Sequence, residues 1–112
     1  MERNDDLFTY GETGFSILLK GSYRKVEWNE INEIIAYKRD LVTTDQVCLD
    51  IVLDESIISF SEENNGWDGF VKKMNAMFPT IDQDWERKVT YPPFATNLTI
   101  LYKKQLSLAC DQ

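Results

Sequence analysis

Acidic side chains are the groups in this chain with the most scope for chemistry, because the 112-residue sequence contains no histidine. The absence of His removes the commonest general base near neutral pH and the Ser–His and Cys–His nucleophile pairs. Two carboxylates brought close together could still act as acid and base. The candidates near strand ends or turns are Asp40, Asp45 and Asp50. Turn and surface roles explain these three residues more simply, so we expect no catalytic residue, and a carboxylate-based hydrolase ranks last among the functions considered.

One pattern in the sequence could bind a metal ion, but it lacks two residues that a calcium-binding loop needs. Asp82, Asp84 and Glu86 resemble the start of a calcium-binding loop. Such a loop needs Gly at its sixth position and a bidentate Glu at its twelfth, whereas this chain has Arg87 and Pro93 there. We therefore expect no metal site and no cofactor.

The charge balance and the N-terminus narrow the class of partner and the compartment. Nineteen acidic residues against twelve basic ones give a net charge of -7, which repels phosphate backbones and argues against nucleic acid as a partner.

The first residues lack the layout of a signal peptide, and no apolar run approaches the ~20 residues that span a bilayer. With only Cys48 and Cys110, reduced thiols are expected. We expect a cytoplasmic protein without integral membrane association.

The acidic groups could form an interface for a basic protein. Asp5-Asp6, Glu62-Glu63 and the group at 82–86 would steer such a partner if they share one face, whereas separate solvated patches would do nothing specific. Exposed aromatic side chains nearby would add contact area. The predicted partner-binding residues are Asp82, Asp84, Trp85, Glu86 and Tyr91.

One compact basic group offers an alternative ligand. Lys20, Arg24 and Lys25 surround the first predicted hairpin and could present several donors to the phosphate of an anionic lipid head group. The same residues could equally form a solvated hairpin without any ligand.

Alternating apolar residues predict a series of antiparallel strands. A strand at 14–20 is followed by a bend at Gly21-Ser22 and a strand at 23–28. Asn29 is a candidate N-cap for one helical turn, with Trp28 and Ile31 pinning this corner to the core. Further strands are predicted at 34–41, 46–53 and 56–61, separated by polar turns.

The rest of the chain predicts two helices and a last strand. Residues 66–78 carry an apolar stripe at helical spacing, formed by Trp67, Phe70, Val71, Met74, Met77 and Phe78, which suits a helix packed on a sheet. Ile81, Trp85 and Val89 suggest a short second helix over 82–88. Residues 97–103 read as a final strand that could pair within the chain or with a second copy, which leaves a homo-oligomer open. We expect one globular domain over 1–104 and a tail over 105–112.

The order of these patterns from Gly14 to Phe78 resembles the bacterial pleckstrin-homology-like families. The resemblance rests on the segments VEWNEI, TTDQVCLDIVL, ISF and GWDGFVKKM. In those families a W-x-x-I-x-x-I corner joins strands of a curved sheet, and an amphipathic helix closes its open end. The segment from Trp85 to Tyr102 extends past that plan. The resemblance implies a binding scaffold, which takes lipid head groups in some members and peptides or proteins in others.

Together these features predict an α+β fold: a curved, mostly antiparallel, pleckstrin-homology-like sheet packed by one amphipathic helix, with a short second helix and a C-terminal strand. The favoured function is a non-enzymatic, cytosolic protein-binding module for an unknown basic protein, a class that includes immunity proteins that cover the active site of a toxin. The alternative is binding of anionic lipid head groups through Lys20, Arg24 and Lys25.

Overall fold

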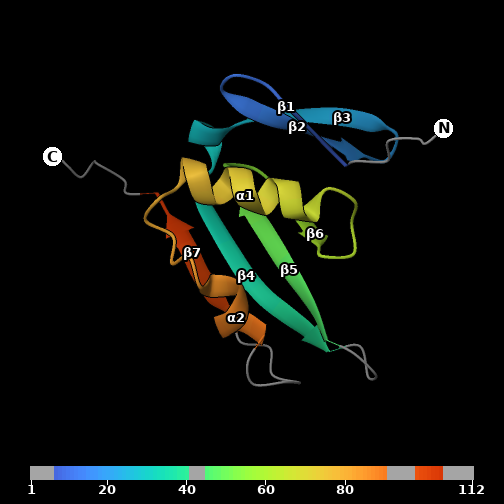
Figure 1. Ribbon diagram of the computed structural model, residues 1–112. Helices are drawn as coiled ribbons and strands as arrows, with labels where there is room; N and C mark the ends of the chain where they lie inside the picture. The colour runs from blue at the N-terminus through green and yellow to red at the C-terminus, as the bar shows by residue number, and fades with distance from the viewer. Residues whose placement is uncertain (1–6, 41–44, 91–97, 105–112) are drawn as a thin grey trace, which may run out of the picture.

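The computed structural model describes residues 7–40, 45–90 and 98–104. Within them the chain forms seven strands, two α-helices and one 3₁₀ helix. The strands divide into two antiparallel sheets, one of three strands and one of four (Figure 1). The α+β class is therefore confirmed, and the strands lie in two sheets where a single curved one was expected.

The three-stranded sheet has the order β1-β2-β3 and consists of β1 (Phe8–Tyr10), β2 (Gly14–Leu19) and β3 (Ser22–Glu27). β1 was not predicted, because three residues are too few to show an alternating pattern. The β2–β3 hairpin turns through Lys20 and Gly21, which have φ angles of 49° and 85°. Two successive residues with positive φ match the twist of tight hairpins, and Gly adopts this conformation without steric cost.

The four-stranded sheet has the order β6-β5-β4-β7. Its strands are β4 (Glu33–Asp40), β5 (Asp45–Val52), β6 (Ile57–Ser61) and β7 (Thr99–Lys103). β7 pairs antiparallel with β4, with a register shift between Ile34 and Ile35. The C-terminal strand therefore pairs within the chain.

A corner at η1 (Trp28–Glu30) separates the two sheets. Its N-cap is Glu27, not the predicted Asn29, and Glu27 and Glu30 form a reciprocal capping box. The amide of Glu27 donates to Oε1 of Glu30 at 3.0 Å, which satisfies a donor that the short helix leaves free. Trp28 and Ile31 are buried as predicted. The corner redirects the chain from β3 into β4, so β4 begins a new sheet.

Both helices lie on one face of the four-stranded sheet, and α1 also contacts the three-stranded sheet (Figure 1). α1 spans Trp67–Met77 and α2 spans Trp85–Thr90. The Phe70 ring of α1 lies 4.7 Å from the Phe8 ring of β1 and 5.0 Å from the Phe60 ring of β6, measured between centroids. One apolar core thus joins both sheets and α1. No described helix is long and apolar enough to cross a membrane.

Candidate functional site

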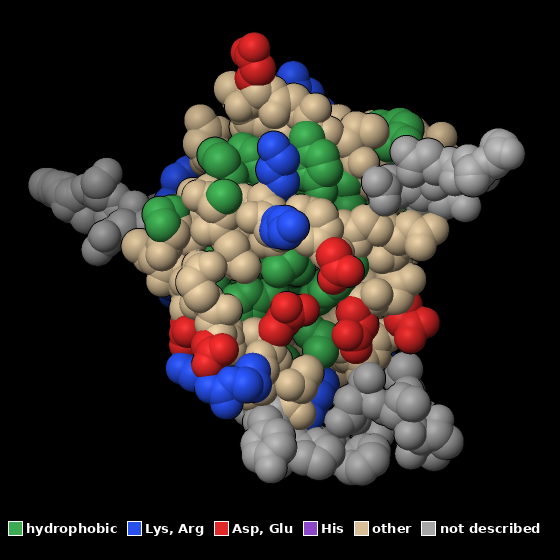
Figure 2. Space-filling view, in the orientation of Figure 1, with side chains coloured by type: hydrophobic (Ala, Val, Ile, Leu, Met, Phe, Trp, Pro, Cys, Tyr) green, Lys and Arg blue, Asp and Glu red, His purple; other side chains and the backbone are tan. Residues whose placement is uncertain are grey.

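Exposed acidic side chains gather on the surface that carries the two helices. Figure 2 shows them between and beside α1 and α2. The indole Nε1 of Trp67 donates to Oε2 of Glu86 at 3.2 Å, which brings α2 beside the first turn of α1. We call this surface the acidic face and define it by the exposed acidic residues of α1, α2 and the segments that lead into them: Glu62, Glu63, Asp68, Asp82, Asp84 and Glu86. Asp5 and Asp6 lie outside the described residues.

Two of the predicted binding carboxylates are paired within their own segment. Asp82 accepts a hydrogen bond from Lys88 Nζ at 2.5 Å, and Asp84 pairs with Arg87. The hydrogen bond from Lys88 lowers the pKa of Asp82, and the one from Arg87 lowers the pKa of Asp84. These exposed ion pairs connect the segment before α2 to the helix and offset part of its negative charge.

Other carboxylates of the acidic face accept hydrogen bonds from neutral donors. Oε2 of Glu62 accepts from the amide of Val47 at 2.9 Å, and Glu86 accepts from the Trp67 indole. A hydrogen bond from a neutral donor orients a carboxylate without cancelling its charge. The same two helices also carry the exposed cations Lys72, Lys73, Arg87 and Lys88, so the acidic groups of this surface are interspersed with basic ones.

The expectation that Trp85 is exposed for contact with a partner is wrong. Trp85 is 2% exposed, its ring lies against the Trp67 ring at a centroid distance of 6.4 Å, and its Nε1 donates to Oδ1 of Asn75 at 3.3 Å. Ile81 and Val89 are buried with it. The spacing of four between Ile81, Trp85 and Val89 therefore reflects one apolar face packed against the core. Tyr91, the other predicted aromatic contact, lies outside the described residues.

The predicted basic group does not form one site. Arg24 and Lys25 are neighbours on β3, and adjacent side chains of a strand point to opposite faces. Arg24 Nη1 donates to Oγ of Ser56 at 2.9 Å, whereas Lys25 Nζ lies 3.8 Å from Oε2 of Glu27. Lys20 sits in the hairpin turn. The three cations therefore do not converge on one phosphate.

The structure sets Asp50 apart from the other two candidate catalytic aspartates along the β4–β5 hairpin. The backbones of Asp40 and Asp45 pair at the turn end of the β4–β5 hairpin, whereas Asp50 pairs with Ile35 five positions further along β5. Oδ1 of Asp50 accepts from Ser59 Oγ at 2.7 Å and from Tyr37 OH at 3.1 Å. This geometry holds Asp50 in a hydrogen-bond network on the sheet surface.

Tyr37 and Cys48, which lie beside that network, have pKa values raised by burial. Burial, followed by the negative charge of Asp50, raises the pKa of Tyr37. Burial also raises the pKa of the Cys48 thiol, which is free. A thiol with a raised pKa is a poor nucleophile. Cys110 lies outside the described residues, and within the described ones no group of three or more His, Cys, Asp or Glu side chains is placed to hold a metal ion.

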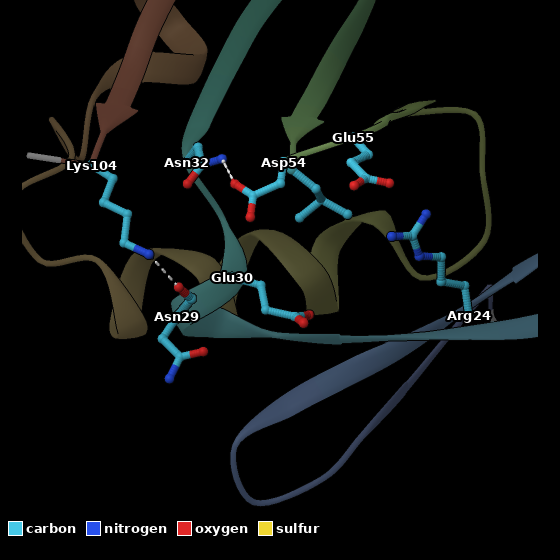
Figure 3. Close-up of a pocket in the computed structure, with 8 residues that line it drawn as sticks. Arg24, Asn29, Glu30, Asn32, Asp54, Glu55 and Lys104 are labelled. Atoms are coloured by element: carbon cyan, nitrogen blue, oxygen red, sulfur yellow. Dashed lines mark hydrogen bonds between the residues drawn. The ribbon is translucent and has the colours of Figure 1, made fainter. Parts of the chain in front are cut away.

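A polar hollow that the sequence did not reveal opens where β3, η1, the β5–β6 turn and the end of β7 meet. Its volume is about 430 Å³. Figure 3 shows Lys104 and Arg24 on opposite sides, with carboxylate-bearing residues between them. The residues that line it are Arg24, Asn29, Glu30, Asn32, Leu53, Asp54, Glu55 and Lys104.

Short hydrogen bonds hold the walls of this hollow. Asn32 Nδ2 donates to Oδ1 of Asp54 at 2.7 Å, and the Asn32 amide donates to the Val52 carbonyl at 2.8 Å. Lys104 donates from its amide to the Asn32 carbonyl and from its Nζ to the Asn29 carbonyl, both at 2.7 Å. These hydrogen bonds fix the positions of the residues that line the hollow at the junction between the sheets.

An apolar hollow of about 410 Å³ adjoins the polar one, and both are lined by Asn29 and Lys104. Its apolar wall consists of Trp28, Met77, Phe78, Pro79 and Tyr102. We call the two hollows together the cleft. Its residues come from separate segments of the chain, so no local motif could have predicted it.

Comparisons with protein-family models, with curated proteins and with solved structures found no match to this chain.

Proposed function

We propose that this protein is a non-enzymatic, cytosolic protein-binding module whose acidic face binds a basic partner protein. The observation that carries the proposal is the gathering of acidic side chains on the one surface that both helices form (Figure 2). An immunity-type inhibitor, which covers the active site of a basic toxin, is one form of this function.

Long-range electrostatics support this choice. The net charge of -7 attracts a basic protein from a distance, and charges concentrated on one face orient the encounter and raise its rate. Such an attraction weakens as salt screens it, because the Debye length is about 8 Å at physiological ionic strength. The partner should therefore bind more weakly at high salt.

The fold adds a second line of support. A buried Trp28 and Ile31 at the corner between strands, followed by an amphipathic helix packed on the core, agree with the resemblance to pleckstrin-homology-like binding scaffolds. We therefore propose that the chain belongs to that fold group, with its strands divided between two antiparallel sheets.

Charge reversal on the acidic face tests the proposal. The tagged protein would capture partners from a lysate of its source cells at low and high salt, beside a Glu63→Lys/Asp68→Lys variant and a Glu12→Lys control. All three positions are exposed, and Glu12 lies in the turn between β1 and β2. We expect a basic protein that is retained at low salt, is lost from the double variant and is kept by the control. A partner that binds both variants equally would contradict the proposal.

The lipid alternative is weaker, because Arg24 and Lys25 have separate partners. It predicts that vesicles containing an anionic phospholipid bind the protein and that Lys25→Glu abolishes this binding. Vesicle binding with that sensitivity would replace the acidic face as the functional surface.

A further inference from the structure

We propose that the cleft binds an extended peptide segment of a protein partner, with a Lys or Arg side chain in the polar hollow and an apolar side chain in the apolar one. This site is separate from the acidic face, because the two share no residue. The inference goes beyond the proposed function and does not depend on it.

The apolar hollow offers a surface for one apolar side chain. Met77 at the end of α1 is 46% exposed, although it belongs to the apolar stripe that the sequence places against the core. Beside it the Phe78 ring lies 4.4 Å from the Tyr102 ring, between centroids. Met is flexible and polarizable and adapts to different apolar partners. An incoming apolar side chain would cover Met77 and complete this partly open wall.

The polar hollow carries an excess of negative charge. Three carboxylates, from Glu30, Asp54 and Glu55, line it with two cations, Arg24 and Lys104. Each cation donates to a neutral oxygen: Arg24 to the Ser56 hydroxyl and Lys104 to the Asn29 carbonyl.

The carboxylates remain available to a ligand. In the described part of the chain none of the three forms an ion pair. Glu30 accepts from the Glu27 amide and Asp54 from the Asn32 amide group, which are neutral donors. Figure 3 shows the carboxylate-bearing residues between the two cations. A guanidinium or ammonium group entering between Arg24 and Lys104 would therefore meet carboxylates that form no ion pair with described residues, and it would form charge-assisted hydrogen bonds with them.

The arrangement of the two hollows specifies the ligand further. They adjoin at Asn29 and Lys104, so a ligand that fills both must present its two groups side by side. In an extended peptide, residues i and i+2 point to the same side and lie roughly 6–7 Å apart. A Lys or Arg two positions from a large apolar residue meets this requirement, whereas a free basic amino acid would fill only the polar hollow.

Selection from a random peptide library displayed on phage, with the full-length protein as target, tests the inference. We expect a consensus with a Lys or Arg two positions from a large apolar residue. A synthetic peptide with this consensus would then be titrated by fluorescence anisotropy against the wild type, Glu55→Lys, Met77→Glu and the acidic-face variant Asp68→Lys. We expect each cleft variant to bind at least about tenfold more weakly: Glu55→Lys through one lost charge-assisted hydrogen bond, and Met77→Glu through the lost burial of an apolar side chain. Asp68→Lys should bind as the wild type does.

Several outcomes would overturn the inference: no enriched peptide, an acidic or wholly polar consensus, or binding unchanged in both cleft variants. A second copy seated in the cleft would also overturn it, and sedimentation would then show a dimer that Met77→Glu dissociates. Circular dichroism would confirm that the variants fold, which is expected because Glu55 and Met77 are exposed. Loss of peptide binding in Asp68→Lys alone would assign the peptide to the acidic face instead.

Discussion

The Lys38 Nζ atom donates a 2.8 Å hydrogen bond to the carbonyl oxygen of Thr90, the last residue of α2. Lys38 is 2% exposed and lies on the face of β4 that also buries Ile34 and Ala36. A lysine is seldom buried unless its charge finds a partner, and the carbonyl end of a helix favours a positive charge. Lys38 therefore ties α2 to the four-stranded sheet.

Replacement of Lys38 should loosen α2. We expect Lys38→Met, which keeps most of the apolar stem, to lower the free energy of unfolding by about 1–2 kcal/mol through the lost hydrogen bond. Lys38→Ala should cost more, because it also removes the buried stem. Urea unfolding followed by circular dichroism measures both. A Lys38→Met protein at least as stable as the wild type would show that the buried charge costs as much as its bond contributes.

Gly14 should tolerate no side chain. A Cβ atom at this position would lie 2.1 Å from the Val26 carbonyl oxygen, on the strand that pairs with β2. Because backbone atoms cannot move aside singly, we expect Gly14→Ala to lower the midpoint of thermal unfolding strongly or to prevent folding. Gly11→Ala is the matched control, since a Cβ there meets nothing within 4 Å. Equal melting temperatures for the two variants would show that the β2–β3 pairing differs from the one described.

Trp85 should matter for stability. Because its ring is buried against Trp67, Trp85→Ala should lower the free energy of unfolding by about 3–5 kcal/mol, the range for buried aromatic truncations. Trp85→Phe should cost less, because it keeps an aromatic ring and loses mainly the bond to Asn75. Chemical unfolding followed by far-ultraviolet circular dichroism avoids the change in tryptophan fluorescence. A negligible loss in Trp85→Ala would mean that α2 does not depend on this contact.

The segment before α2 should contribute stability that depends on pH. The pKa values of Asp82 and Asp84 are lowered from an ordinary 3.8 by Lys88 and Arg87. A group whose folded pKa is depressed stabilises the fold above its unfolded pKa and loses this effect as pH falls through the folded value. The side chains of both pairs are exposed, so the effect is small and salt-sensitive.

Thermal unfolding of the wild type and of Asp82→Asn/Asp84→Asn, near neutral pH and well below 3.8, checks this expectation. The wild type should melt at the higher temperature near neutral pH, and the gap should close in acid. A gap that widens in acid would contradict the assigned pairs. Glu12→Gln serves as a control for loss of an exposed acidic charge.

The local patterns of the sequence determined most of the elements. Alternating residues such as Val47, Leu49 and Ile51 predicted a strand because side chains alternate between the faces of a strand, and β5 has these three residues buried. The helical spacing at 67–78 predicted α1 for the same kind of local reason. Trp28 and Ile31 marked the corner, because a single helical turn must bury its apolar side to be stable.

Only the tertiary structure decided how these elements meet. The division into two sheets and the pairing of β7 with β4 depend on contacts between distant segments, which local periodicity does not encode. The same holds for the burial of Trp85 against Trp67 and for the cleft, where Arg24, Asp54 and Lys104 meet from three parts of the chain. Local spacing sets which face of an element is apolar, but the packing of those faces against one another sets which side chains remain free to bind.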